Sequence, residues 1–203
     1  MTDTSDCTAR SSTRAEAQRD RILCAALKCF IEHGFHAASM ANIAEAAQMS
    51  AGLMYRYFEN KNAIVLAIVE RQLAEKREAI RQLHSSEDFA NRLQHVFEEW
   101  RLRGANTISV ALLLEMSAEA TRNPQIAQAL RAADALARSE LQAWLGRSRS
   151  EGGLGLPEDV AARRALLLQC LVEGLAVRAA REPDLDSRQL RSALDDLFEH
   201  LLP

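Results

Sequence analysis

Two tyrosines, an arginine and a lysine lie within the seven-residue sequence YRYFENK, which ends at Lys61. The hydroxyl groups of Tyr55 and Tyr57 can donate hydrogen bonds to phosphate, and their rings can pack on a sugar or a thymine methyl group. Arg56 can read a base edge or bind a phosphate. Packing of a protein core does not require this combination, so the cluster favours a surface that contacts DNA.

Two short helices are needed to position this cluster. Ser39 is suited to cap a helix whose apolar residues, Ile43, Ala44 and Ala47, repeat at helical spacing. Ser50 can cap a second helix over residues 51–57. Because only about three residues separate the two helices, the spacing predicts a helix-turn-helix, whose second helix enters the DNA major groove.

The predicted second helix suits close approach to bases. Gly52 removes a side chain where the backbone must come near the DNA, and Ala51 and Leu53 offer apolar surface to thymine methyl groups. Ser39 and Ser50 lie at helix N-termini, where free amides favour anions. Arg56 is the one strong base-edge hydrogen-bonder of this helix, so we expect DNA shape and methyl contacts to contribute much of the specificity.

Lys61 occupies an unfavourable place for a cation. Asn60 is the expected N-cap of the next helix, so Lys61 falls in its first turn and opposes the helix dipole by about 0.3–1 kcal/mol. A nearby DNA phosphate would account for this position. The alternatives are a solvated lysine and an ion pair with Glu59.

Composition predicts an all-α protein. The 203 residues are 48% hydrophobic, with only 8 glycines and 4 prolines, and alanine and leucine dominate. The net charge of −3 does not by itself indicate a nucleic-acid binder. Residues 1–13 are polar and lack periodicity, which predicts a disordered tail.

Several classes of function lack support in the sequence. The five histidines and four cysteines show neither a metal-ligand spacing nor a nucleophile–base arrangement, and there is no glycine-rich phosphate loop. We therefore expect no enzyme activity, no metal and no cofactor. A polar N-terminus and short apolar runs predict a cytoplasmic protein with reduced thiols and no membrane contact.

Apolar periodicity extends the helical prediction through the rest of the chain. A helix precedes the helix-turn-helix and is stopped by Gly34, a typical C-cap residue. The expected ranges are 14–33, 62–83, 87–103, 107–121, 124–149, 157–181 and 187–202.

The sequence resembles the TetR/AcrR (tetracycline-repressor) family of bacterial regulators. The matching residues are Arg21-Ile22-Leu23, Ala25-Ala26, Phe30, Gly34-Phe35, Ser39-Met40, Ile43-Ala44, Ala47, Met49-Ser50, Gly52, Tyr55-Arg56-Tyr57-Phe58 and Lys61. One departure is Gln48, where the family usually has glycine in the turn. Either a non-glycine residue takes a conformation that glycine adopts more readily, or the turn shifts slightly.

The resemblance implies an architecture and a function. A three-helix DNA-binding domain (residues 14–61) would precede a six-helix ligand-binding and dimerisation domain (62–203). The family's DNA-contact positions fall on Ser39, Met40, Ser50, Gly52, Leu53, Tyr55, Tyr57 and Lys61. The protein would be a homodimeric repressor, released from a double-stranded palindromic operator when a small-molecule effector favours a tilt of helix 62–83. The alternatives are an activator without a small-molecule inducer and a helical dimeric interaction module.

The last two helices are expected to form the dimer, and the middle helices a ligand pocket. The candidate interface residues are Leu171, Leu175, Leu190, Leu194, Leu197, Phe198 and Leu201, although such stripes can also face their own core. The candidate pocket residues are Phe97, Trp100, Leu112, Glu115, Met116, Trp144 and Cys170, and aromatic residues or methionines of this kind can equally be plain core.

Glu115 interrupts the apolar run of helix 107–121, and a lone buried carboxylate is costly. It would pair with an arginine, lie at an exposed edge, or face a cationic ligand.

Overall fold

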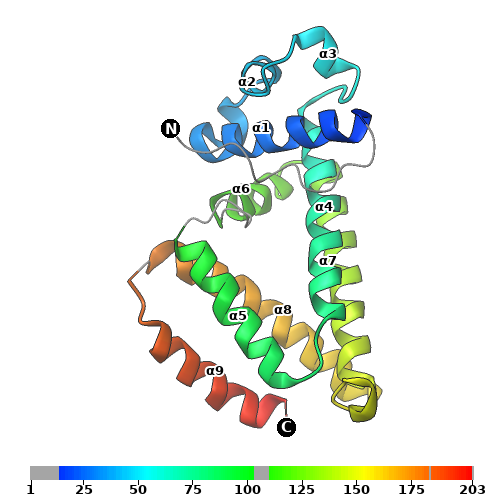
Figure 1. Cartoon of the computed structure of the whole chain (residues 1–203), viewed down its shortest axis with the longest axis vertical. Helices are drawn as coiled ribbons and strands as arrows, with labels where there is room; N and C mark the ends of the chain where they lie inside the picture. Colours follow the sequence, from blue (N-terminus) through cyan, green and yellow to red (C-terminus); the bar gives the residue numbers. More distant parts are fainter. Residues whose placement is uncertain (1–13, 103–109, 183, 203) are drawn as a thin grey trace. The chain divides into compact units, whose positions relative to one another are not determined.

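The computed structural model describes residues 14–102, 110–182 and 184–202. All regular elements in these ranges are helical (Figure 1). The α-helices are α1 Arg14–Ala37, α2 Met40–Ala46, α3 Ala51–Tyr55, α4 Lys61–Arg81, α5 Ser86–Arg101, α6 Val110–Ala120, α7 Pro124–Gly146, α8 Glu158–Arg181 and α9 Ser187–Leu201. The predicted tail at residues 1–13 and the predicted helix start at 107–109 lie outside the described residues. No helix within them is long and apolar enough to cross a membrane.

The described chain forms two compact units. The first contains the chain up to Arg71 together with Ala111–Leu130, and the second contains Gln72–Val110 and Arg131–Pro203. The sequence placed the boundary at residue 61 and assigned residues 107–121 to the C-terminal domain. In the structure, most of α6 lies in the same compact unit as the helix-turn-helix.

The first unit is built on one apolar face of α1. Ile22, Ala26 and Phe30 are fully buried, as are Ile43 of α2 and Met54 of α3. Short helices such as α2 and α3 are marginal on their own in water. Helix α2 packs on α1 and α3 packs on α2, and burial of one apolar side in these contacts stabilises both short helices.

Gly34 ends the regular part of α1, as predicted. Its φ of 77° and ψ of 160° are not helical, although the helical assignment continues to Ala37. After this kink the ring of Phe35 packs on Phe30, with 5.4 Å between ring centroids. The chain then reaches Ser39, the N-cap of α2.

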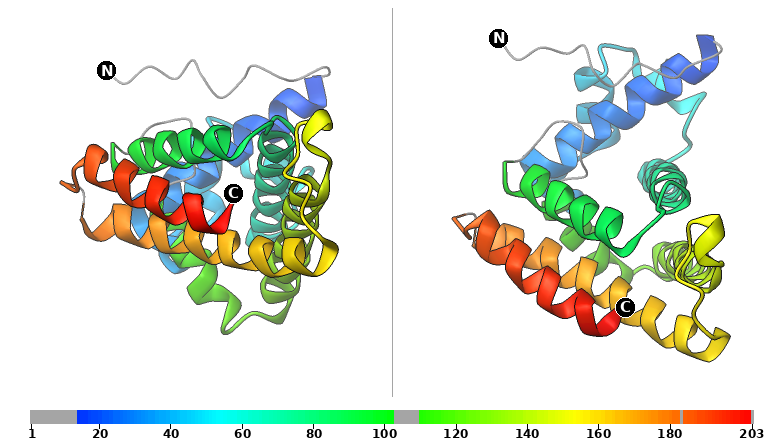
Figure 2. Two further views of the ribbon diagram at one scale, coloured as in Figure 1. Left: turned by 90° about the horizontal axis from the view of Figure 1, so that it is seen from below. Right: turned by 60° about the horizontal axis from the view of Figure 1, so that its bottom comes forward.

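The second unit contains an aromatic row. Phe89 of α5 lies 5.6 Å from Trp144 of α7 and 5.6 Å from Phe198 of α9, measured between ring centroids. Figure 2 shows α5 lying against both α8 and α9. Aromatic pairs at this separation add about 0.5–1.5 kcal/mol to the effect of burial.

An ion-pair clasp joins α4 to α7 in the second unit. Arg77 donates to Glu140 Oε1 from Nε at 2.7 Å and from Nη2 at 2.6 Å, and Arg81 Nη2 donates at 3.2 Å. The hydrogen bond from Arg77 is the largest cause that lowers the pKa of Glu140.

We expect Glu140→Gln to lower the free energy of unfolding by about 0.5–1 kcal/mol at pH 7, since both partners are partly exposed. A carboxylate with a lowered folded-state pKa stabilises the fold above its unfolded pKa and loses that contribution as pH falls through the folded value. The difference between variant and wild type should therefore shrink in acid. Urea unfolding at pH 7 and in acid, with Glu78→Gln as the control, measures it. A difference that is independent of pH would contradict the prediction.

Candidate nucleic-acid interface

The first helix of the helix-turn-helix, α2, begins with a capping box. The Ser39 hydroxyl accepts a hydrogen bond from the Asn42 amide at 3.1 Å, and the Ser39 amide donates to Asn42 Oδ1 at 3.0 Å. These contacts satisfy two amide donors at the helix start. The other amides of the first turn remain oriented to bind an anion.

The turn confirms the strain predicted at Gln48. Its φ is 51°, and it is the one non-glycine residue with positive φ in the part of the chain described. Arg21 Nη2 donates to the Gln48 carbonyl at 2.9 Å, and the Met49 amide donates to the Ala44 carbonyl at 3.0 Å. The turn is thus fixed both by α1 and by its own backbone.

The second helix, α3, is shorter than predicted. It ends at Tyr55 rather than residue 57, with Arg56 as its C-cap. Ser50 caps it as predicted, accepting from the Leu53 amide at 3.3 Å. Met54 is fully buried and anchors the helix to the unit.

The opposite face of α3 is open. Ala51, Gly52, Tyr55 and Arg56 are exposed, with 55% of the Tyr55 surface accessible. A Cβ added at Gly52 would have no neighbour within 4 Å, so a partner can approach its backbone closely. Leu53 and Tyr57 are half-buried at the edges of this face. We call the exposed face Ala51, Gly52, Tyr55 and Arg56 the reading face.

Arg19 of α1 supports the segment that follows the reading face. Its guanidinium lies over the Phe58 ring, 4.5 Å from the centroid, and its Nη1 donates to the Tyr57 carbonyl at 3.5 Å. The supporting roles of Arg19 and Arg21 are not visible in the sequence. Polar residues are expected on the outer face of an amphipathic helix, and the sequence does not indicate that these two arginines contact the distant carbonyls of Tyr57 and Gln48.

Lys61 has protein partners that the sequence did not reveal. Its Nζ donates to the carbonyls of Phe35 at 2.5 Å, Ala38 at 3.0 Å and His36 at 3.3 Å. It also lies 4.3 Å from the centroid of the Phe35 ring. Burial lowers the pKa of Lys61, and the charge of Glu119 partly opposes that shift.

These contacts explain why a lysine is tolerated in the first turn of α4, where it opposes the helix dipole. Carbonyls at the end of α1 account for the cation at this position, and a phosphate is not needed to explain it. A DNA contact by Lys61 stays a prediction that rests on the resemblance alone.

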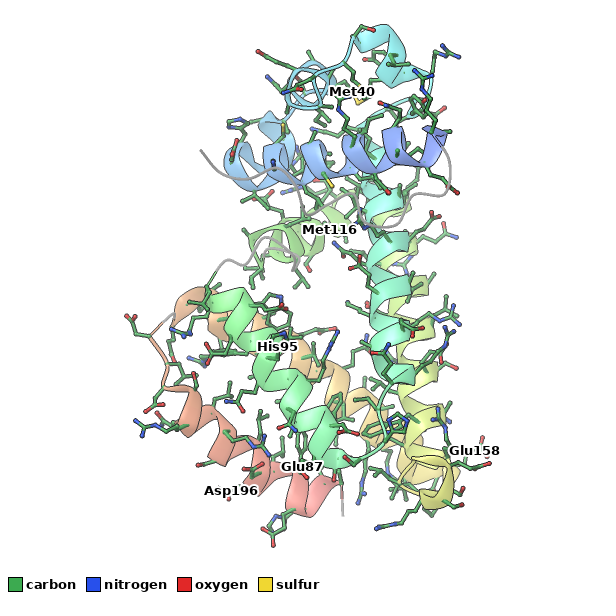
Figure 3. All side chains as sticks on the ribbon, viewed as in Figure 1. Met40, Glu87, His95, Met116, Glu158 and Asp196 are labelled. Atoms are coloured by element: carbon green, nitrogen blue, oxygen red, sulfur yellow. The ribbon has the colours of Figure 1, made fainter. Side chains whose placement is uncertain are left out.

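The predicted pocket residues divide between the two units. Leu112, Glu115 and Met116 belong to α6 in the first unit, where Leu112 and Met116 are buried. Figure 3 labels Met116 on this helix. The other four belong to the second unit, where Phe97 and Trp144 are fully buried, Trp100 is half-buried and Cys170 is exposed. The predicted place of Cys170 in a ligand pocket stays a prediction.

Glu115 has a partner that the sequence did not suggest. Its side chain is half-buried, and its Oε2 accepts a hydrogen bond from the Phe35 amide at 3.2 Å. A backbone amide next to the kink at Gly34 thus meets this carboxylate, and a role toward a ligand stays a prediction.

Most of the predicted dimer residues face the core of their own unit. Leu175, Leu190, Leu194 and Phe198 are all less than 9% exposed. Sequence periodicity identified the apolar stripe of α9 correctly, but the stripe packs on α5. Leu197 is 39% exposed, and Leu171 and Leu201 are half-buried.

Comparison with known proteins identifies the family. The model for bacterial regulatory proteins of the tetR family matches residues 22–68, and the model for the C-terminal part of BetI-type transcriptional repressors matches residues 89–203. The chain belongs to the TetR family of transcriptional regulators. This confirms the resemblance, the all-α fold and the prediction of a DNA-binding regulator rather than an enzyme.

Individual TetR-family relatives differ in how much of the chain they cover. The regulator UidR of Escherichia coli K12 is 37% identical over 123 residues, which span 59% of this chain and 60% of UidR. The repressor ComR of the same strain is 26% identical over 196 residues, covering 91% and 90%.

A solved structure with a similar fold matches nearly the whole chain. Salmonella enterica GusR has a TM-score of 0.75 at 27% identity, covering 94% of this chain and 100% of GusR. A regulator from Saccharomonospora viridis, solved in complex with choline, shares the fold with a TM-score of 0.68 at 21% identity, covering 92% and 97%.

The strained turn offers a test of the local geometry. A left-handed conformation costs a non-glycine residue about 1–2 kcal/mol, and the Gln48 side chain is exposed. We expect Gln48→Gly to relieve this strain and to raise the free energy of unfolding by about 0.5–1 kcal/mol. The gain is smaller than the strain itself, because glycine loses more chain entropy on folding. Gln48→Ala, which keeps the strain, is the matched control in urea unfolding. Equal stabilities of the two variants would contradict the assignment of strain.

Proposed function

We propose that the protein is a homodimeric repressor that leaves a near-palindromic operator when a small molecule binds. The observation that carries this proposal is the reading face, which a buried Met54 and a capped, α1-supported turn hold outward. In a helix-turn-helix this is the surface that enters the major groove. The first helix, with Ser39 and Met40 at its start, would lie across the phosphate backbone.

The chemistry of the reading face suggests how the operator is read. Its one strong hydrogen-bonder to base edges is Arg56, beside the hydroxyl of Tyr55 and the small residues Ala51 and Gly52. Methyl contacts and groove shape would therefore contribute more to specificity than direct hydrogen bonds. Leu53, Tyr57 and Ser50 complete the proposed DNA contacts. A contact from Lys61 rests on the resemblance alone, because its ammonium group already meets three backbone carbonyls.

A dimer is proposed because a palindrome is read by a two-fold pair of helices. The apolar surface left open on α8 and α9 supports it. Leu166 is 45% exposed, Leu167 53% and Leu197 39%, and Gly174 of α8 has open space around it. Together with the half-buried Leu171 and Leu201, these residues replace the buried leucines as the proposed interface.

The repressor role and the effector rest on the relatives. The matching C-terminal family is described as a repressor domain, and ComR is a repressor. FasR of Mycolicibacterium smegmatis, 32% identical over 84 residues, is an activator and keeps that alternative open. The choline complex of one relative supports a small-molecule site in this fold, without naming the effector of this chain.

We expect Tyr55→Ala to weaken binding to the DNA upstream of the protein's own gene by about tenfold, the effect of losing one good contact. Tyr55→Phe should lie between variant and wild type, since it keeps the ring. Fluorescence anisotropy at fixed salt measures both, and thermal unfolding checks that this exposed residue leaves the fold intact. An unchanged affinity of Tyr55→Ala would contradict the assignment of the reading face.

We expect Leu167→Glu to shift the protein from dimer to monomer at micromolar concentration, because it places a charge in an apolar interface. Sedimentation velocity measures the change. Leu136→Glu, at a leucine of α7 that is 46% exposed, is the matched control and should remain dimeric. A dimeric Leu167→Glu protein would exclude this surface as the interface.

A further inference from the structure

The short segment Gly34–Ala38 connects α1 to the helix-turn-helix, and we call it the corner. Ser39, the N-cap of α2, follows it directly. Gly34 breaks helical geometry with φ 77°, and one helical turn follows it, in which the Ala38 amide donates to the Gly34 carbonyl at 3.2 Å. The ends of a helical turn present amides and carbonyls that have no partner within it. Such groups need other hydrogen-bond partners. Two different side-chain systems of the first unit supply them.

Lys61 supplies the donors. Its ammonium group contacts the carbonyls of Phe35, His36 and Ala38 and lies over the Phe35 ring. An ammonium group has three N–H donors, so these carbonyls can occupy its whole donor capacity. This contact ties the corner to the first turn of α4.

Helix α6 supplies the acceptors, through two carboxylates one turn apart. Glu115 Oε2 accepts from the Phe35 amide at 3.2 Å. Glu119 Oε2 lies 3.1 Å from His36 Nε2 and 3.3 Å from Arg122 Nη2. Residues four apart share a helix face, so both carboxylates approach the corner together.

Burial and close packing favour the contact of both carboxylates with the corner. Glu119 is only 7% exposed, and a charge so buried is costly unless it keeps its partners. Gly34 brings its backbone near Glu115, since a Cβ at this position would lie 3.8 Å from Oε1. The backbone of Phe35 is thus held at two points. Its amide donates to Glu115 of α6, and its carbonyl accepts from Lys61 of α4.

We propose that Glu115 and Glu119 are positioning residues for DNA binding, by which α6 fixes the corner and hence the direction in which α2 and α3 leave α1. The DNA-binding domain, residues 14–61, which we call the head, keeps its fold through Lys61 and the core of Ile22, Phe30 and Met54. Losing the α6 contacts frees the corner without unfolding the head. In the dimer of the proposed function, on which this inference rests, the two reading faces then no longer match both half-sites at once.

The test separates positioning from folding by using two DNA duplexes. Wild-type protein is first footprinted on the DNA upstream of its gene, and one half-site of the protected palindrome is then scrambled. We expect Glu115→Ala to lose about five- to twentyfold in affinity for the full site, within the usual range of coupling between sites. Its affinity for the single half-site should change less than twofold. Glu115→Gln keeps an oxygen acceptor for the Phe35 amide and should recover most of the loss.

Ser117→Ala, on the exposed side of the same helix, is the control and should match wild type on both duplexes. Equal losses of Glu115→Ala on the full site and the half-site would show a damaged head and overturn the proposal. So would an unchanged affinity for the full site.

A second measurement needs no DNA. Hydrogen exchange followed by mass spectrometry should show faster exchange across residues 34–46 in Glu115→Ala but not in Glu115→Gln. If the wild-type protein gives no footprint on the upstream DNA, the proposed function fails, and this exchange pattern still decides whether α6 holds the corner. Unchanged exchange in Glu115→Ala overturns the positioning role by itself.

Discussion

The end of α1 sets the constraint on which the DNA-binding head depends. A helix that stops at a kink leaves backbone carbonyls and amides without helical partners, and burying them unpaired costs about 1–3 kcal/mol each. Here an ammonium group meets three of the carbonyls, and a carboxylate meets an amide. Because these side chains come from α4 and α6, the same contacts that satisfy the backbone also join three helices. The path of the chain into α2 follows from this local requirement.

The two helices that follow are too short to be stable by themselves. With seven and five residues, α2 and α3 depend on a few buried side chains and on their serine caps. Helix α3 packs with one side and exposes the other: Met54 is fully buried, while its neighbour Tyr55 is more than half exposed. One helical turn thus serves both the core and the outer surface.

Local signals in the sequence predicted much of this architecture. The caps at Ser39 and Ser50, the break at Gly34 and the strain at Gln48 all depend on residues adjacent in the chain, and the structure confirms them. Partners distant in the chain were not predictable in the same way. Lys61 and Glu115 looked like misplaced charges, because their backbone partners lie 26 and 80 residues away. The stripe of α9 was correct as a pattern, yet periodicity cannot say whether an apolar face meets its own core or a second chain.

The distribution of aromatic residues has a spectroscopic consequence. The chain has two tyrosines and two tryptophans. Tyr55 and Tyr57 both belong to the head, whereas Trp100 and Trp144 both belong to the second unit. Trp144 is fully buried beside Phe89, an apolar setting that favours emission at short wavelength. Tryptophan fluorescence therefore reports events in the second unit, and tyrosine absorption reports events at the head. The unmodified protein carries a separate optical label on each of its two units.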